Sequence, residues 1–374
     1  MATYKEQNKL NVPHLRFPEF HGEWEKCKLG DIAEFSTARV SSVKLDCKNY
    51  VSTENMLQDF QGVVEAKSVP NETNVISFTC GDILISNIRP YLKKVWKATF
   101  DGGCSSDVFV LQATDTVAKD YLHYAVANDK FINYVMSGAK GVKMPRGDKN
   151  QMRTYQLSLP SIQEQYKIAK LLTLLDERIA TQSKLIEKLE SLIKGLAHHC
   201  IRDFTNDCEY IRLGDISKIT TGKLDANAQV ENGQYPFFTC AERPFNIDSY
   251  AFDTEALLIS GNGANLGYIN YYKGKFNAYQ RTYVLDHFSV NIQYVKWALK
   301  VLLPKRIAIE KSSSNTPYIV LSTLADLKIP IPNNSKQNHI ANLMMSFEKK
   351  LSNQLALSDL YNKQKQYMLR QMFI

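Results

Sequence analysis

Between Gln165 and Leu196, apolar residues follow one another in alternating steps of four and three, with the polar Gln182 in the series. A period of 3.5 residues is typical of a helix that packs lengthwise against another helix. A helix on a globular core would also have an apolar face, but this stripe is narrow and continues over about four heptads. We therefore predict a long helix whose seam contains Ile168, Leu172, Leu175, Ile179, Gln182, Ile186 and Leu189.

The C-terminal stretch repeats this pattern and supplies a partner. Its seam, aligned with the first, contains Ile340, Met344, Phe347, Leu351 and Gln354. Gln354 falls at the position of Gln182, and a buried amide requires a polar group opposite it. We therefore predict that the two amides lie at neighbouring levels of one antiparallel helix pair. The later seam positions are less apolar, so we expect looser packing at the far end of the second helix: Ser358, Tyr361, Lys365 and Met368.

Five short motifs occur twice along the chain in the same order. A collinear series of this kind indicates an internal duplication. The pairs are Leu29–Ile32 with Leu213–Ile216, Asp82–Ser86 with Ala256–Ser260, Asp107–Leu111 with Arg281–Leu285, Leu157–Pro160 with Ile329–Pro332, and Gln165–Leu171 with Gln337–Leu343.

Each copy mixes strand and helix signals. Short apolar runs such as 83–86 and 257–260 predict buried strands, whereas 121–127 and 295–303 predict helices. We predict the α+β class, with two globular domains in a pseudo-two-fold repeat separated by an antiparallel two-helix coiled coil. The expected boundaries are 1–160 for the first domain, 161–205 for the central helix, 206–332 for the second domain and 333–374 for the C-terminal helix.

The predicted helices have a length that suits a molecular ruler. About 32 residues at about 1.5 Å each give a rod of about 48 Å. One turn of B-DNA, the usual half-site separation for a two-fold reader, is about 34–36 Å. Two domains held by such a rod could face one side of a duplex.

Composition narrows the choice of partner and compartment only partly. The net charge of +8 and the pI near 8.9 are compatible with a polyanionic partner. The seven cysteines form no C-x-x-C pair, so we expect reduced thiols and no metal site, and we interpret His198–Cys200 with Cys208 as a helix end. The polar N-terminus and the lack of a long apolar run predict a soluble cytoplasmic protein without membrane contact.

The sequence as a whole resembles the specificity subunit of a Type I restriction-modification system. The resemblance rests on the domain–helix duplication, the Trp24…Leu29-Gly-Asp-Ile32 entry and the run from Leu157 to Leu172, and it covers nearly the whole chain. The second copy of that run departs slightly, between Ile329 and Gln337.

The resemblance implies two target-recognition domains that each read one half of a bipartite, asymmetric sequence in double-stranded DNA. It implies that the helices set the half-site spacing and dock two modification subunits and the restriction subunits. It also implies no catalytic residue and no cofactor in this chain, because S-adenosylmethionine, ATP and Mg²⁺ would belong to those partners.

Recognition requires cations for phosphates and planar hydrogen-bonding groups for base edges. Two segments of the first domain combine such residues, one after a predicted strand and one rich in glycine. A solvated surface loop would have the same composition, and the resemblance favours DNA contact. The candidates are Ser86, Asn87, Arg89, Tyr91, Lys93, Lys143, Arg146 and Lys149.

The second domain offers a different set at its loops: Asn262, Asn265, Lys273, Arg281, Lys311 and Asn315. Counterpart positions differ, since glycines and Asn265 stand where the first domain has Asn87 and Arg89. We therefore expect one scaffold to read two different half-sites.

The main alternative is a DNA adenine methyltransferase, because Gly261–Gly263 resembles a cofactor turn and Ser314–Tyr318 a catalytic loop. The first lacks the G-x-G-x-x-G spacing, the second has threonine in place of the first proline, and the first repeat has neither. A nuclease function, suggested by the triplet of Asp59, Glu65 and Lys67, has less support than the methyltransferase function. The sequence has no P-loop motif, so we do not expect this chain to hydrolyse ATP. A scaffold that binds only protein would leave the basic loops unexplained.

Overall fold

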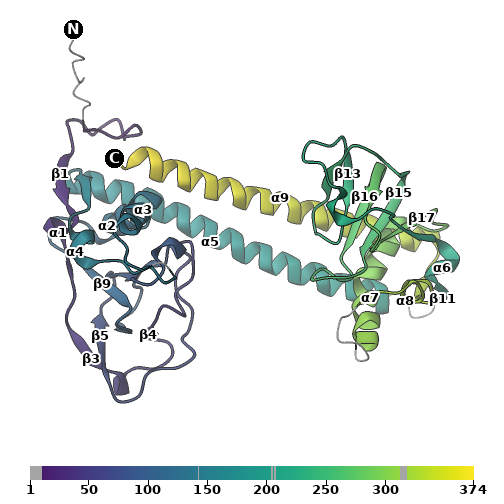
Figure 1. Cartoon of the computed structure of the whole chain (residues 1–374), viewed down its shortest axis with the longest axis horizontal. Helices are drawn as coiled ribbons and strands as arrows, with labels where there is room; N and C mark the ends of the chain where they lie inside the picture. The colour runs from purple at the N-terminus through teal and green to yellow at the C-terminus, as the bar shows by residue number, and fades with distance from the viewer. Residues whose placement is uncertain (1–10, 142, 204, 206–207, 312–317) are drawn as a thin grey trace, which may run out of the picture. The chain divides into compact units, whose positions relative to one another are not determined.

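The duplicated motifs lie in two units that share one element order. The computed structural model describes residues 11–141, 143–203, 205, 208–311 and 318–374. Unit 1 comprises Met1–Gln182 with Ser358–Ile374, and unit 2 comprises Ser183–Leu357. Each unit contains a domain of helices and mainly antiparallel strands, together with parts of two long helices, α5 (Ile162–His198) and α9 (Asn334–Met372) (Figure 1). The predicted fold class is therefore confirmed.

The strands of unit 1 form a two-stranded sheet, β1-β10, and two four-stranded sheets, β2-β9-β6-β7 and β3-β5-β8-β4. Its elements before α5 are β1 (Glu25–Lys28), α1 (Leu29–Ile32), β2 (Ala33–Phe35), β3 (Arg39–Ser41), η1 (Ser42–Lys44), β4 (Tyr50–Val51), β5 (Asn74–Phe78), β6 (Ile83–Ser86), η2 (Pro90–Leu92), β7 (Val95–Lys97), β8 (Gly102–Cys104), β9 (Val108–Ala113), α2 (Lys119–Val126), α3 (Asp129–Ser137), α4 (Lys149–Arg153) and β10 (Gln156–Leu159).

Unit 2 has the two-stranded sheet β11-β18 and a six-stranded sheet in the order β12-β17-β15-β16-β13-β14. Its elements are the π-helical turn η3 (His199–Asp203), β11 (Glu209–Arg212), α6 (Leu213–Ile216), β12 (Lys218–Thr221), η4 (Ala226–Ala228), β13 (Tyr235–Phe238), β14 (Phe245–Ile247), β15 (Phe252–Ser260), β16 (Ile269–Ala278), β17 (Thr282–Asp286), α7 (Ile292–Lys311), α8 (Leu321–Ala325) and β18 (Lys328–Ile331).

The continuous apolar runs are strands that are buried on both faces. In β6, Ile83 and Ile85 join the core formed with α2 and α5, while Leu84 joins a second cluster on the opposite face. In β15, Leu257 faces the core under α7 and Leu258 faces away from it. Because neither face meets water, the sequence shows no alternation there.

The repeated Leu-Gly-Asp-Ile motif forms one helical turn, α1 or α6, that docks against the end of its own domain. Leu29 N donates to Tyr155 O at 2.8 Å, and Leu213 N donates to Leu327 O at 2.9 Å. Both leucines are fully buried. A Cβ on Gly30 would lie 3.1 Å from Arg153 Cβ, so glycine permits this close approach.

A buried glutamine amide joins each globular domain to the start of its long helix. Gln165 Oε1 accepts from Ala118 N at 2.8 Å, and Gln165 Nε2 donates to Pro160 O at 3.0 Å. In unit 2, Gln337 Oε1 accepts from Asn291 N at 3.0 Å and Gln337 Nε2 donates to Pro332 O at 2.8 Å. The repeated Gln-x-x-Ile-Ala motif therefore encodes the same joint twice.

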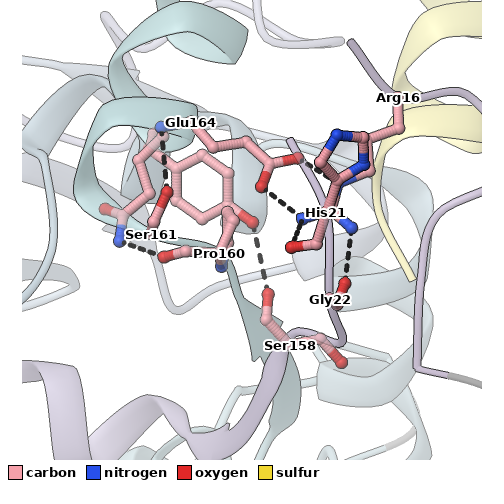
Figure 2. Close-up of polar contacts among 9 residues, drawn as sticks. Arg16, His21, Gly22, Ser158, Pro160, Ser161 and Glu164 are labelled. Atoms are coloured by element: carbon pink, nitrogen blue, oxygen red, sulfur yellow. Dashed lines mark hydrogen bonds and ion pairs between the residues drawn. The ribbon is translucent and has the colours of Figure 1, made fainter. Parts of the chain in front are cut away.

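The N-terminal segment adds a second tie at the start of α5. The Arg16 guanidinium donates to both carboxylate oxygens of Glu164 at 2.8 Å, and it also donates to Gly22 O (Figure 2). The Glu164 side chain is 1% exposed, so its charge needs this bidentate partner. The first turn is capped by Ser161 Oγ, which accepts from Glu164 N.

In unit 1, the first half of α5 runs antiparallel to the end of α9 (Figure 1). Asp176 pairs with Lys365 at 2.5 Å, and the Arg178 guanidinium lies 5.6 Å from the centre of the Tyr361 ring. The predicted seam positions Ile168, Leu172 and Leu175 are buried and Ile179 is half-buried.

The expectation of loose packing at the far end of α9 is wrong for its last turn. The seam positions from Ser358 to Met368 are only half-buried, as their polarity suggests. Leu369, Met372 and Phe373, however, are buried in the core of unit 1, where the Phe373 ring stacks on Tyr121. These three residues follow the last predicted seam position, Met368, and they are buried against apolar residues of the first domain.

In unit 2, the end of α5 and the start of α9 share a core with α7. Leu189, Ile340 and Met344 are buried in this core, whereas Ile186, Phe347 and Leu351 are half-buried. Gln182, in unit 1, is 7% exposed, and Gln354, in unit 2, is half-buried. That the two amides lie at neighbouring levels of one antiparallel helix pair stays a prediction.

A partly buried cluster of one carboxylate and two lysines fixes α7 to α9. Glu348 accepts hydrogen bonds from Lys296 Nζ at 2.6 Å and Lys300 Nζ at 2.9 Å. Burial alone would raise the pKa of Glu348, but the two ammonium groups outweigh it and lower that pKa. Asp176, at the equivalent position in unit 1, instead accepts from Tyr124 Oη at 2.8 Å.

Replacing Gln165 with leucine should destabilise unit 1 by about 1–3 kcal/mol, because it leaves a buried N–H and a buried carbonyl without partners. Urea unfolding followed by circular dichroism would measure the loss. Gln163→Leu, at an exposed position in the same turn, is the matched control. Equal stability of the Gln165→Leu variant and the wild type would contradict this role for the amide.

Replacing Glu348 with glutamine should lower stability at neutral pH by about 1–3 kcal/mol. The folded-state pKa of Glu348 lies below its unfolded value, so the carboxylate stabilises the fold above pH about 4.5 and this contribution is lost as the pH falls through the folded-state pKa. The difference between wild type and variant in urea midpoint should therefore shrink on acidification.

The exposed pair of Asp359 with Lys363 on the same helix provides the control. Asp359→Asn should change stability by less than about 1 kcal/mol. A gap between wild type and Glu348→Gln that stays constant from pH 7 to pH 3 would contradict the assignment to the ionised carboxylate.

Candidate nucleic-acid interface

Three backbone hydrogen bonds shape the loop after β6 in unit 1. Ser86 N donates to Lys94 O at 3.0 Å, and Asn87 N donates to Asp107 O at 2.9 Å. Gly147 N donates to Asn87 O at 2.8 Å, which brings the second basic segment against the first. We call residues 86–94, Asp107, 140–141 and 143–149 the first loop cluster. The structure thus brings together the two segments that the sequence singled out.

The loop after β15 in unit 2 has the same three bonds. Ser260 N donates to Tyr268 O at 3.0 Å, Gly261 N donates to Arg281 O at 2.8 Å, and Ile319 N donates to Gly261 O at 2.8 Å. We call residues 239–241, 261–268, 279–281 and Ile319 the second loop cluster. The two clusters share a backbone framework and differ in their side chains.

Two predicted contact residues in the first loop cluster are buried. Ser86 is 2% exposed, and its hydroxyl donates to Ile88 O at 3.0 Å. Asn87 is 8% exposed. The Ser86 hydroxyl therefore shapes the loop, and the Asn87 side chain presents little surface to a ligand.

Arg89 and Tyr91 lie at the exposed tip of the same loop. Arg89 adopts the left-handed conformation with φ of 49°, and its N–H donates to Pro145 O at 2.8 Å. Tyr91 is 48% exposed on the short helix η2. A strained backbone fixed from both sides holds the Arg89 guanidinium on the surface.

The other candidate cations of this cluster differ in whether a neighbouring side chain already contacts their charged group. Lys93 Nζ lies 2.8 Å from Asp129 Oδ1, so an internal carboxylate neutralises it. Lys149 Nζ lies 4.7 Å from the centre of the Phe109 ring, and burial lowers the pKa of this lysine. Lys143 and Arg146 are exposed, and Arg146 has a carboxylate oxygen of Asp107 at 3.6 Å.

In the second loop cluster, two asparagines hold neighbouring loops together. Asn265 Nδ2 donates to Cys240 O at 3.0 Å, and the Cys240 thiol donates to Asn262 Oδ1 at 3.0 Å. Arg281 is exposed beside Tyr283. Burial raises the pKa of Tyr283, and the charge of Arg281 works against that rise.

Of the other candidates of the second domain, Lys273 lies outside this cluster. Lys273 lies in the middle of β16, paired with Glu255 at 3.4 Å. Lys311 is the last residue of α7, and Asn315 lies outside the described residues. The methyltransferase-like loop 314–318 falls largely in the same gap.

The sequence reasoning missed two polar residues of the clusters. Asp107 was aligned with Arg281 through the duplicated strand, and that alignment was the signal that both border the same loop. Cys240 is one of the seven cysteines, none of which the sequence pairs with a contact role. Its partners come from loops distant in sequence, so no local pattern could reveal it.

Within the described ranges, no group of three or more histidine, cysteine or acidic side chains could hold a metal ion. His199 Nδ1 instead lies 3.0 Å from Asp203 Oδ2, and Cys200 is buried. The helices of the same ranges include none long and apolar enough to cross a membrane.

Comparison with known proteins matches both halves of the chain. The model of the Type I restriction modification DNA specificity domain matches residues 21–191 and 205–357. The EcoDI specificity subunit of Escherichia coli is 44% identical over 135 residues, which cover 36% of this chain and 30% of that protein. The MjaVIII specificity subunit of Methanocaldococcus jannaschii is 22% identical over 93% of this chain and 91% of its own.

The fold has a solved counterpart. The crystal structure of a Type I restriction-modification S subunit from M. genitalium aligns with a TM-score of 0.68 over 97% of this chain and 99% of that one, at 18% identity. With the family model matched once to each copy of the duplicated unit, the chain belongs to the Type I restriction-modification DNA specificity family.

Proposed function

We propose that the first and second loop clusters each read one half of a bipartite, asymmetric target in double-stranded DNA. The observation that carries this proposal is the shared backbone framework with unlike side chains. Arg89 stands where the second cluster has Gly263, and Asp107 stands where it has Arg281. A common framework gives both loops the same approach to a groove, and different donors and acceptors then select different bases.

Among the predicted contact residues, exposure suggests a division of roles. Arg89, Arg146 and Arg281 are exposed guanidinium groups suited to guanine edges, while Lys143 suits a phosphate. Tyr91, two residues after Arg89 in the same loop, offers an exposed planar side chain. Ser86, Asn262 and Asn265 would act mainly by holding the loops in shape, and Asn87 would present little surface to DNA.

We further propose the domain limits 1–160 and 206–332, with 161–205 and 333–374 as spacer helices. The starts of α5 at Ile162 and α9 at Asn334, each fixed to its domain by a buried amide, support these limits. The helices would set the permitted distance between half-sites. Their exposed faces would dock two modification subunits and the restriction subunits.

In this proposal the chain itself is not catalytic and acts in the cytoplasm. The catalytic steps would use S-adenosylmethionine, ATP and Mg²⁺ on the partner subunits. The relatives named as specificity subunits support this division of labour.

Arg281→Ala should relax the preference in one half-site only, at a cost of about 1–3 kcal/mol for the cognate base pair. Arg89→Ala should do the same in the other half-site. The measurement is competition binding of the full chain, alone and with its co-purified partners, to duplexes altered in one half-site. Lys93→Ala is the control, with at most a small, uniform weakening, because Asp129 already neutralises this lysine.

The assay also tests DNA binding itself. Phosphate contacts should give a steep fall in affinity with salt concentration. A chain whose complex binds no duplex at low salt would favour a scaffold that binds only protein.

Inserting four residues into each helix, near Gln182 and Gln354, should change the permitted spacing while leaving both half-sequences unchanged. The physical reason is that each added helical residue lengthens the spacer by about 1.5 Å. Methylome sequencing of cells that express the full complex would report the spacing. The same spacing after the insertion would refute the ruler.

A further inference from the structure

We propose that Asp107 is a specificity-determining residue of the first domain, where its carboxylate accepts a hydrogen bond from an exocyclic amino group of a base. Adenine N6 and cytosine N4 are the groups of this chemistry in the major groove. The inference rests on the proposed function of the loop clusters and names the acceptor that domain 1 uses.

The position of Asp107 is fixed by the framework. Its carbonyl oxygen accepts from Asn87 N at 2.9 Å, as the carbonyl oxygen of Arg281 accepts from Gly261 N at 2.8 Å. Asp107 also directly precedes Val108, the first residue of β9, which is completely buried. A side chain anchored to a rigid strand in this way keeps its place at the loop surface.

The carboxylate is accessible and not saturated. The Asp107 side chain is 35% exposed. Its ionic neighbour in the described part of the chain is Arg146, at 3.6 Å, which is longer than a hydrogen bond. A carboxylate has about four lone-pair sites, so acceptor capacity remains for a ligand.

A negative charge at this place conflicts with a role in phosphate binding. The Asp107 carboxylate lies in a cluster whose exposed charged members include Arg89, Lys143 and Arg146. This carboxylate would repel the phosphates of the DNA backbone. Hydrogen bonds from base amino groups would offset that repulsion. Arg281, a pure donor at the equivalent place, suits guanine instead. The two half-sites should therefore differ at the corresponding base pair.

The test is selection of bound duplexes from a library with both half-sites randomised, using the full chain alone and with its co-purified partner subunits. Asp107→Ala should reduce the preference for adenine or cytosine at one position of one half-site by about tenfold or more. The other half-site should be unchanged. Asp107→Asn, which keeps the shape, should shift that position towards adenine, the base that asparagine pairs with through two bonds.

Two variants separate this role from simpler ones. Asp115→Ala removes an exposed charge elsewhere in unit 1 and should raise affinity for all sequences alike. If Asp107→Ala behaves like Asp115→Ala, the inference is overturned. It is also overturned if Asp107→Ala and Arg146→Ala lose the same base preference, since the carboxylate would then only orient the arginine.

Different results would overturn the proposed function and this inference. A wild-type chain without preference in either half-site, in both preparations, would overturn the proposed function and the inference with it. A wild-type chain with preferences that Asp107→Ala and Asp107→Asn leave intact would overturn the inference alone.

Discussion

The buried amide at the start of each long helix is the constraint on which the architecture depends. Gln165 and Gln337 each accept from the backbone at the start of a domain helix and donate to the carbonyl of the proline that follows the last strand of the domain. A hydrogen-bonded amide in an apolar core is directional, so it fixes the angle between helix and domain as well as their contact. Apolar packing alone would leave that angle less defined.

Apart from this shared amide, the two units use different polar contacts between the long helices and their domains. Asp176 meets a tyrosine hydroxyl and Lys365, whereas Glu348, at the equivalent position, meets two lysines. The start of α5 also carries the Arg16–Glu164 pair. The geometry of a repeat can thus persist while its polar contacts diverge, because a partly or fully buried charge needs only some partner of the right kind.

The two loop clusters at the surface also keep a common geometry while their side chains differ. Their framework consists of backbone hydrogen bonds, which do not depend on side-chain identity, so the exposed residues are free to vary. Gly261 is an exception: a Cβ there would lie 2.4 Å from Arg281 O. Glycine is therefore favoured at this position of unit 2, whereas unit 1 has Asn87 at the equivalent position and keeps the same hydrogen bond. At the exposed positions, recognition can change without loss of the fold.

The sequence by itself determined the duplication, the strands buried on both faces, the two long helices and their apolar seam, because these are periodic or local signals. The family could also be inferred from the order of short motifs. Only the tertiary structure decided which basic residues are free: Lys93 is neutralised by Asp129 and Lys149 lies over an aromatic ring. It also decided that Leu369 and Met372 pack into the core of unit 1 and that Asp107 borders the loop cluster. These contacts join residues far apart in the chain, and a local pattern carries no information about a partner that folding alone brings near.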